Sequence, residues 1–268
     1  MNDNYASFNN ERESVSFANN QINLNPFIFL ETGLVSWMDV AFLVQTQTNW
    51  QNGQSGGGIG DVQLTPGFKV YQQTRYIPQV KIFIQETFPT GAYDNLNPYK
   101  NGLDATGGGS YKTQIGFIVG KLFLWQYQNP LRVRMSMGYT MASPVSVNNF
   151  NVYGGGFGTR GTVKPGNTFG TDLGLELSLT QRWVFAMDFV YTYTSSTTFS
   201  GYPGIALDGT TAVLGKPSSD NLSLAPAFEY NWNQNLGVIG GVQFSVYGRN
   251  STNFISAIIS VCYVFDMM

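Results

Sequence analysis

Charged side chains within strand-like segments are the first candidates for chemistry in this chain. Counted from the nearest short connection, they fall at a comparable depth on their segments and on the same side of the residue alternation. A ring of such groups would attract, repel or orient polar solutes. The sequence therefore predicts a charged belt that acts as a selectivity region, formed by Asp39, Lys69, Lys81, Arg132, Arg134, Glu176, Asp188 and Glu229.

Two interpretations of this belt are open. In a closed sheet, the order of the segments sets a basic arc against an acidic arc, and the transverse field between them favours polar or dipolar solutes. Alternatively, the charges pair with one another, Arg134 with Glu176 and Asp188 nearby, and fill a narrow interior with side chains. The sequence does not decide between the two.

Catalysis is not expected from these residues. The chain contains no histidine, which excludes a serine hydrolase that needs an imidazole base. Glu176 and Asp188 could form an acid–base pair, but nearby arginines would keep both carboxylates ionised. The run Gly56-Gly57-Gly58-Ile59-Gly60 lacks the Lys-Ser/Thr ending and the following helix of a phosphate loop. We expect a protein that is not an enzyme and holds no cofactor.

Composition excludes further classes of protein. The single cysteine, Cys262, has no partner for an internal disulfide, and without histidine no metal site is expected. The net charge of −2, with no cluster of Lys and Arg, gives no reason to expect a nucleic-acid partner. Only 11% of the residues are charged, against roughly 25% in soluble domains, so a wholly water-facing surface is not expected.

The segments that must position the belt alternate in polarity. Residues 183–194 read W-V-F-A-M-D-F-V-Y-T-Y-T, with a large apolar or aromatic side chain at every odd position. The pattern recurs along most of the chain, and no helical segment covers the apolar faces, which indicates lipid as their solvent. No apolar run approaches the roughly 20 residues of a transmembrane helix. The prediction is an all-β fold, a transmembrane antiparallel up-and-down β-barrel.

Strand-like segments and their connections organise the chain. The segments cover residues 26–34, 38–50, 59–72, 77–88, 111–124, 131–142, 169–180, 183–199, 221–232, 236–248 and 253–265. Short connections near 35–37, 73–76, 126–130, 181–182 and 233–235 alternate with longer ones at 51–58, 89–110, 143–168 and 200–220. Bacterial outer-membrane barrels place short turns in the periplasm and long loops outside the cell. The loops at 89–110 and 143–168 are long enough to fold into the bore, and the alternative is that they remain solvated tips.

Strand parity predicts one further strand. We call a strand descending if it runs toward the periplasm and ascending if it runs away from it. If the last segment descends and ends in the periplasm, counting back through the alternating strands shows that the segment at 26–34 also descends. Bacterial single-chain barrels have even strand numbers, so an ascending strand must precede this segment. Residues 11–22, with Val15 and Phe17 two positions apart, are the candidate. The expected barrel has about twelve strands. Residues 1–10 are expected to form a periplasmic tail, and residues 11–268 the single barrel domain.

Aromatic residues gather near the short connections, as an interfacial girdle would. These residues are Trp37, Trp125, Tyr127, Trp183, Tyr230, Trp232 and Tyr263. Glu86 and Lys121 fall on the predicted lipid face. Glu86 lies near the outer end, where burial costs little or a bulge turns the side chain inward, and the long Lys121 side chain can reach the headgroups.

Short motifs in order resemble a known family. Gly60-Asp61-Val62, Phe88-Pro89-Thr90-Gly91, Gly138-Tyr139 and Tyr263-Val264-Phe265 resemble the outer-membrane family labelled "MetA-pathway of phenol degradation", over most of residues 26–265. This resemblance implies a barrel that admits small, often aromatic or hydrophobic compounds, and it brings no catalytic residues. Tyr263 and Phe265 also resemble the carboxy-terminal signal read by barrel-assembly machinery, although Asp266-Met267-Met268 follow the aromatic residue.

The expected function is that of a passive channel or transporter for small solutes in the bacterial outer membrane. Expected partners are outer-membrane lipids and lipopolysaccharide, the barrel-assembly machinery during biogenesis, and the solutes themselves, with the protein a monomer. The start Met1-Asn2-Asp3-Asn4 lacks the features of a secretory signal, and we expect that the export signal has been removed. The alternative is a closed structural or adhesion-type barrel whose long loops bind an external partner.

Overall fold

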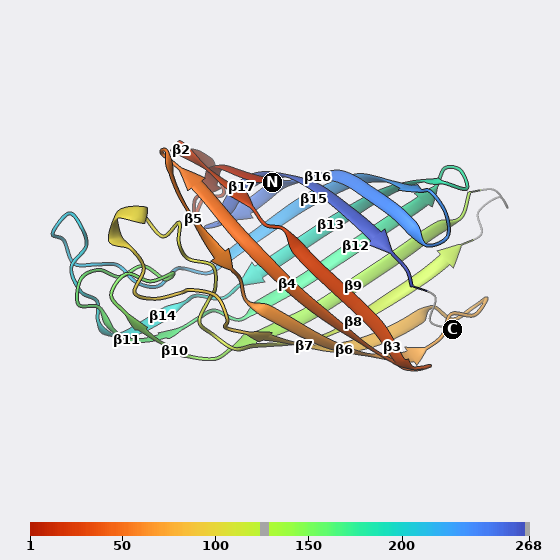
Figure 1. The fold of residues 1–268 in the computed structure, drawn as a ribbon, viewed down its shortest axis with the longest axis horizontal. Coiled ribbons are helices and arrows are strands. Elements are labelled where there is room, and N and C mark those ends of the chain that lie inside the picture. The colour runs from red at the N-terminus through yellow and green to blue at the C-terminus, as the bar shows by residue number, and fades with distance from the viewer. Residues whose placement is uncertain (124–128, 266–268) are drawn as a thin grey trace.

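The computed structural model describes residues 1–123 and 129–265, and its regular elements are strands apart from one short 3-10 helix (Figure 1). The predicted turn at 126–130, the girdle residues Trp125 and Tyr127, and Asp266-Met267-Met268 lie wholly or partly outside the described residues. In chain order the elements are β1 (Asn2–Phe8), β2 (Ser14–Leu24), β3 (Phe27–Val35), β4 (Met38–Gln51), β5 (Gln54–Ile59), β6 (Val62–Tyr71), β7 (Gln79–Phe88), the 3-10 helix η1 (Pro98–Lys100), β8 (Lys112–Phe123), β9 (Leu131–Ala142), β10 (Val145–Asn148), β11 (Arg160–Lys164), β12 (Thr168–Ser178), β13 (Trp183–Thr194), β14 (Thr198–Tyr202), β15 (Ser219–Asn231), β16 (Leu236–Arg249) and β17 (Thr252–Tyr263). Among these elements, no helix is long and apolar enough to cross a membrane.

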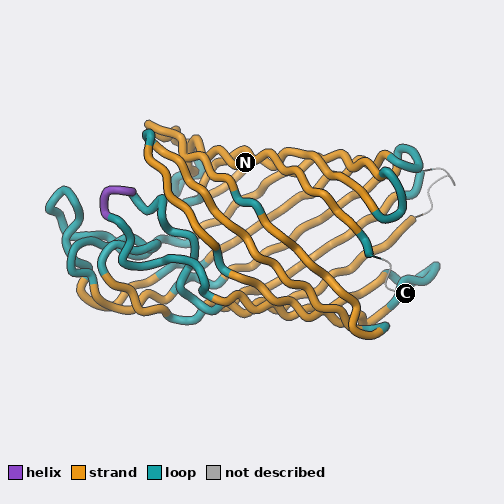
Figure 2. Tube along the Cα trace, in the orientation of Figure 1, coloured by secondary structure: helices purple, strands orange, loops and turns teal. Residues whose placement is uncertain are grey.

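The main sheet closes into a 12-stranded antiparallel barrel, as predicted. β2 and β3 count as one strand, because Leu24 pairs with Thr48 and Phe27 with Gln45 in an unbroken register along β4. Pro26 lies between them and has no backbone N–H to donate to the ladder. Figure 2 shows the long strands crossing the barrel obliquely, with short turns at one end and most of the loop residues at the other. We call these the short-turn end and the long-loop end.

The first strand differs from the prediction. Residues 2–8 form β1, which pairs with β17 on one side and with β2 on the other, so they are not a tail. The segment predicted at 11–22 is largely β2, and it runs in the same direction as β3 rather than against it. The parity argument correctly required an ascending strand, but it placed this strand too late. Asn, Asp and Ser are depleted in strands, and the Asn-rich start therefore hid β1.

The predicted long connection at 51–58 is also wrong, because residues 54–59 form β5, which pairs with β4 through a tight hairpin. β5 and β6 together pair with β4 as one strand that contains an irregularity. Ile59 pairs with Thr46 and Gln63 with Leu43, so β5–β6 holds one extra residue over this stretch. Such an extra residue is a β-bulge, which changes the direction of the side chains next to it. The bulge lies at Gly60-Asp61-Val62.

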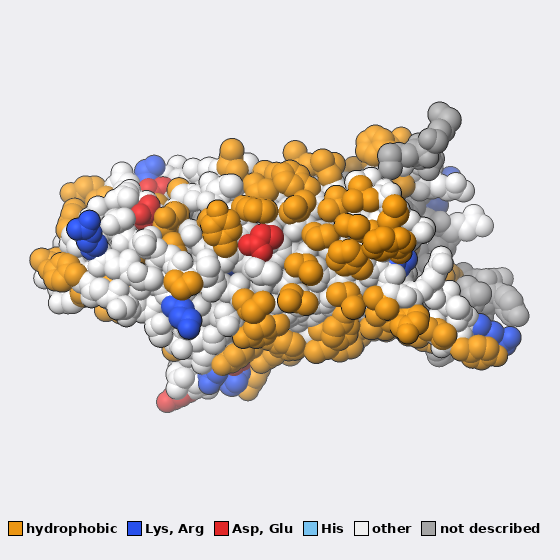
Figure 3. Space-filling view, turned by 90° about the horizontal axis from the view of Figure 1, so that it is seen from below, with side chains coloured by type: hydrophobic (Ala, Val, Ile, Leu, Met, Phe, Trp, Pro, Cys, Tyr) orange, Lys and Arg blue, Asp and Glu red, His pale blue; other side chains and the backbone are white. Residues whose placement is uncertain are grey.

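The outward face of the wall is apolar. Phe42 pairs with Leu64 and Leu173 with Phe189, and all four side chains are exposed, as the predicted register requires. Figure 3 shows hydrophobic side chains gathered over the barrel wall, whereas other side chains dominate the loop-rich part. In water, an apolar band of this extent would be unfavourable, which is the pattern expected of a wall facing hydrocarbon.

Aromatic residues mark both ends of this band. Of the predicted girdle, Trp37, Trp183, Trp232 and Tyr263 are exposed at the short-turn end, and Tyr230 packs between Trp183 and Trp232 with ring centroids 4.8 and 5.0 Å away. A second group at the long-loop end was not predicted: Tyr111, Tyr139, Tyr193 and Tyr247. Tyrosine and tryptophan prefer the two interfaces of a membrane, so both groups fit the ends of the band.

The two charged residues predicted on the outward face stay there. Glu86 pairs with Leu64 in the ladder, and its carboxylate accepts a hydrogen bond of 2.6 Å from the Thr113 hydroxyl. Lys121 extends to the short-turn end, where its ammonium donates to the carbonyl of Tyr76 at 3.1 Å. Each charge therefore has a polar partner, which lowers the cost of its position.

The long loops fold into an ordered unit beyond the barrel. Strands β10, β11 and β14 form a separate antiparallel sheet. Val145, Val147 and Val163 form its small buried core, against which side chains from three different loops pack: Tyr93, Tyr153, Phe199 and Leu214. The alternative that the loops at 89–110 and 143–168 are only solvated tips is therefore wrong for their residues in this core.

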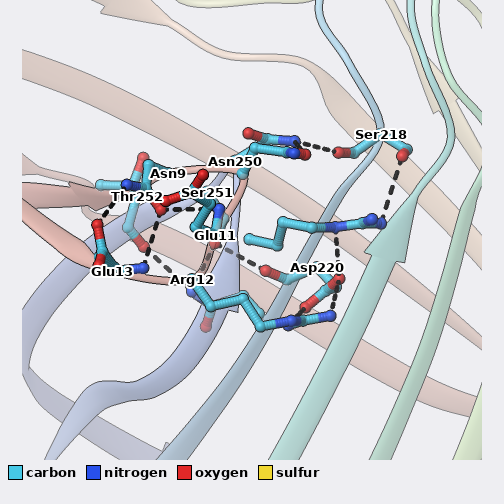
Figure 4. A network of polar contacts seen from close by, with 12 residues as sticks. Asn9, Glu11, Arg12, Glu13, Ser218, Asp220, Asn250, Ser251 and Thr252 are labelled. Carbon is cyan, nitrogen blue, oxygen red and sulfur yellow. Dashed lines mark hydrogen bonds and ion pairs between the residues drawn. The ribbon is translucent and has the colours of Figure 1, made fainter.

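An ion-pair network joins the first strands to β15 and β16 at the long-loop end (Figure 4). Arg12, in the β1–β2 turn, binds the Asp220 carboxylate in a bidentate manner at 2.6 and 3.1 Å. The Arg249 guanidinium forms a second ion pair with this carboxylate, at 3.3 Å. The Asp220 side chain is only 6% exposed. Ser251 donates to the Asp220 carbonyl at 2.7 Å. The network spans β17 and so reinforces the place where the barrel closes.

Candidate functional site

A cavity of about 370 Å³ lies within the barrel, on the inner side of neighbouring strands β3 to β9. Five of the eight predicted belt residues line it, together with one carboxylate that was not predicted, Glu31. The charged residues of its lining are Glu31, Asp39, Lys69, Lys81, Arg132 and Arg134. The sequence alternation therefore placed these predicted residues on a common surface.

One ion-pair group lies on the β3–β7 side. The Lys81 ammonium is 2.7 Å from the Asp39 carboxylate and 3.1 Å from that of Glu31. Asp39 and Lys81 lie on β4 and β7, which are separated by β6. Asp39 pairs in the ladder with Gly67, whereas Lys81 pairs with Lys69, and its side chain reaches back over Gly67 to Asp39. A Cβ atom at Gly67 would lie 2.2 Å from the Lys81 side chain and 2.5 Å from Asp39. The missing side chain is what lets the two charges meet across β6.

A second group lies on the β9–β13 side and uses the same arrangement. The Arg134 guanidinium is 3.6 Å from Asp172 and 3.7 Å from Asp188. Gly174 of β12 pairs with Arg134 on one side and with Asp188 on the other. A Cβ atom there would lie 2.7 Å from the Asp188 carboxylate and 3.3 Å from Arg134. Two residues from Arg134 on β9, the Arg132 guanidinium is 3.6 Å from the Glu176 carboxylate of β12.

Two belt residues lack an ion pair among the described residues. The Lys69 ammonium donates to the carbonyl of Ser36 at 3.4 Å, and its ladder partner is Lys81. Glu229 is half-buried on β15 and pairs in the ladder with Val184. On one side of the cavity, Lys69 therefore adds a positive charge that has no ion-pair partner among the described residues.

The ion pairs bear on the second interpretation of the belt, in which the charges pair with one another, whereas the transverse field between a basic and an acidic arc stays a prediction. Charges pair along the wall, but Arg134 pairs with Asp172 and Asp188, whereas Glu176 pairs with Arg132. Sequence analysis missed Glu31 and Asp172. The signal for Asp172 was available, because it has the same parity as Glu176 on its strand, and Glu31 has the parity of its inward-facing neighbours in the ladder.

The carboxy-terminal aromatic residues form a separate candidate site. Tyr263 ends β17, and the ring of Phe265 lies 4.6 Å from it, centroid to centroid. Both side chains are exposed, Phe265 at 75%. An exposed pair of this kind is accessible to other proteins, and its role as an assembly signal stays a prediction. Cys262 lies in β17 as a strand residue, as expected.

Substitution of Gly174 tests the arrangement of the ion pairs. We expect Gly174→Val to push Arg134 away from Asp188 and to lower the free energy of unfolding by about 1–3 kcal/mol. Gly170→Val is the matched control, because Gly170 lies on the same face of β12 and an added Cβ there meets nothing within 4 Å. Urea unfolding in lipid vesicles, followed by tryptophan fluorescence, measures both. Equal losses in the two variants would contradict this explanation.

Comparisons with known proteins support the fold. No family model matches the chain, and no curated protein matches its sequence, so the family resemblance stays a prediction. Among solved structures, the chain is similar to the crystal structure of the COG4313 outer membrane channel from Pseudomonas putida F1. The TM-score is 0.71, with 98% of this chain and 91% of that chain covered, at 13% sequence identity. At this identity the likeness shows a shared barrel fold.

Proposed function

We propose that the protein is a bacterial outer-membrane channel through which small solutes pass passively, with the charged belt as its selectivity region. The observation that carries the proposal is the contrast between the two faces of the wall. The outward face carries exposed apolar residues between two aromatic groups, and the inner face carries a cavity lined by six charged residues. An apolar exterior around a charged interior is the arrangement of water-filled outer-membrane barrels.

The charged groups that line the cavity are also suited to selection among polar solutes. The paired charges keep their side chains in fixed positions, and Lys69 adds a cation without a carboxylate partner among the described residues. Low-dielectric walls strengthen the field of such groups in a narrow aqueous passage. We propose small polar solutes as the first class to test, with phenolic compounds as the class that the family resemblance implies.

Single-channel recording tests the proposal. We expect the purified barrel, reconstituted in planar bilayers, to give stepwise conductance in potassium chloride, and liposomes that contain it to take up small solutes. Its orientation, with the short turns in the periplasm, is part of the proposal and is checked by proteolysis of the long loops from outside whole cells. A correctly folded barrel that is electrically silent and takes up no solute would contradict the channel.

The rival function is a closed barrel whose long loops bind an external partner. The observation in its favour is the ordered unit formed by β10, β11 and β14, which exposes the apolar side chains of Phe157, Ile205 and Val213. This function predicts no conductance. Deletion of β10 and β11 would then abolish attachment to a surface or cell and leave solute uptake unaffected.

A further inference from the structure

The loop of residues 89–111, between β7 and β8, is fastened to the barrel by one carboxylate. Asp61 in the bulge between β5 and β6 is 7% exposed. Its Oδ1 accepts the Gly91 amide at 3.0 Å, and its Oδ2 accepts the Gly108 amide at 2.9 Å. Gly91 lies near the start of the loop and Gly108 near its end, so a single side chain holds both ends. We call these two contacts the Asp61 latch.

Further hydrogen bonds attach the same loop to the wall. The Thr90 hydroxyl donates to the Gly60 carbonyl at 2.8 Å and accepts the Val62 amide at 3.2 Å. In the middle of the loop, the side-chain amide of Asn49 donates to the Leu103 carbonyl at 2.9 Å. The loop is therefore fastened at its ends and at its centre, and it cannot swing away without breaking hydrogen bonds that are largely buried.

The loop lies on the inner side of the wall. Asn49 has the same parity on β4 as Asp39 and Ala41, whose side chains face the interior, and it is 6% exposed beneath the loop. An added Cβ atom at Gly56 of β5 would lie 2.6 Å from the Leu103 carbonyl. Backbone therefore packs directly on backbone here. A layer of chain inside the rim narrows the opening of the barrel.

The neighbouring loop holds this layer from its other side. The Tyr153 hydroxyl donates to the Gly108 carbonyl at 2.6 Å, and burial, with a smaller contribution from Asp61, raises the pKa of Tyr153 to about 12. The phenol therefore remains a donor at physiological pH. The Val152 amide also donates to the Tyr93 carbonyl at 2.8 Å. The loop has one fixed position between the barrel wall and the second sheet.

We propose that the Asp61 latch positions residues 89–111 as the constriction of the passage at the long-loop end, and so sets its conductance and the size of solute that passes. The proposal rests on the proposed channel function. Asp61 is a positioning residue, because it acts through the loop rather than by contact with solute. Its carboxylate is suited to this task, since it accepts two backbone N–H groups that would otherwise lack partners inside the rim.

Conductance of the Asp61→Ala variant tests the proposal in the full-length protein. We expect a single-channel conductance about twice that of the wild type or more, with more current noise, because the two ends of the loop lose their latch contacts and fluctuate at the opening, although Asn49 and Tyr153 still hold the loop elsewhere. The matched control is Asp208→Ala. Asp208 is another loop aspartate, but its carboxylate accepts hydrogen bonds from the nearby Thr210. If the wild-type barrel conducts and the correctly folded Asp61→Ala variant has the same conductance, the loop is not the constriction, while the channel function stands.

A disulfide rescue separates a released loop from a damaged barrel. An added Cβ at Gly58 would lie 3.5 Å from the Thr106 methyl group, so cysteines at these positions can join the loop to β5. In an Asp61→Ala, Cys262→Ser background, Gly58→Cys with Thr106→Cys should restore the wild-type conductance on oxidation and lose it on reduction. If the two cysteines do not cross-link in a protein that retains Asp61, the loop does not lie next to β5, and the proposal is overturned whatever the conductance. If neither the wild type nor Asp61→Ala conducts ions, the channel function and the constriction are both overturned.

Discussion

Asp220→Ala is expected to lower the free energy of unfolding by about 2–3 kcal/mol. Its carboxylate is buried and carries ion pairs to Arg12 and Arg249, so its removal leaves two guanidinium groups next to each other without a counter-charge. Breaking a buried pair typically costs about 3–5 kcal/mol. The expected loss is smaller here because the side chains of Arg12 and Arg249 are 33% and 30% exposed and water can partly solvate them.

The measurement is urea unfolding of the barrel in lipid vesicles, with gel mobility before and after heating as a second readout of barrel closure. A double-mutant cycle with Arg12→Ala isolates the pair that joins the β1–β2 turn to β15. Asp104→Ala is the control, because the Asp104 carboxylate accepts the Asn97 amide within its own loop and, among the described residues, has no ion pair. Stability equal to that of the wild type in Asp220→Ala would show that the strand ladders alone close the barrel.

The same network shows where prediction from the sequence succeeded and failed. Segments with strong period-2 alternation, such as Trp183–Thr194, predicted strands, faces and the barrel, because one face of each strand is apolar along its whole length. β1 has no such face, and its place is set by pairing with β17, more than 240 residues away. Pairing between the two ends of a chain leaves no local pattern. For this reason the barrel closure, with Arg12 and Asp220, could not be predicted.

The candidate site was predictable in position but not in its contacts. Parity placed Lys81, Arg134 and Asp188 on the inner face, since alternation along a strand is local. Their partners depend on residues without side chains: Gly67 and Gly174 open the space through which charges meet across an intervening strand. Two motifs of the family resemblance, at residues 60–62 and 88–91, proved to contact each other through Thr90 and Asp61. Such a contact requires the bulge, which the alternation did not predict.

Arg134→Glu is expected to increase the preference of the channel for cations over anions by about thirtyfold. The belt with its added carboxylates holds four basic residues, Lys69, Lys81, Arg132 and Arg134, and six acidic ones, Glu31, Asp39, Asp172, Glu176, Asp188 and Glu229. We therefore expect a modest cation preference in the wild type. The substitution changes the charge between Asp172 and Asp188 by two units and leaves three neighbouring carboxylates with no guanidinium between them.

The magnitude follows from Coulomb's law in a wet passage. A unit charge about 6 Å from a passing ion, at an effective dielectric constant of about 60, contributes about 0.9 kcal/mol. A change of two units shifts the energy of a cation by about 2 kcal/mol and that of an anion by as much in the opposite direction, so the difference between them changes by about 4 kcal/mol before screening. Salt at about 0.1 M reduces this difference to about 2 kcal/mol, which corresponds to about thirtyfold. The reversal potential across a potassium chloride gradient measures the preference, and Arg134→Gln should give about half of the shift in free energy.

Arg182→Glu provides the control that gives this result its meaning. Arg182 lies at the same short-turn end but in the exposed β12–β13 turn, where it contacts the Tyr230 hydroxyl, so its reversal should leave the ion preference unchanged. If Arg134→Glu and Arg182→Glu shift the reversal potential equally, the effect is one of overall surface charge. If neither shifts it while the barrel still conducts, ions bypass the cavity, and the charged belt serves only to brace the inner wall. A shift confined to Arg134→Glu places the conduction path along the belt, because screening limits so large an effect to charges within a few ångströms of the ion.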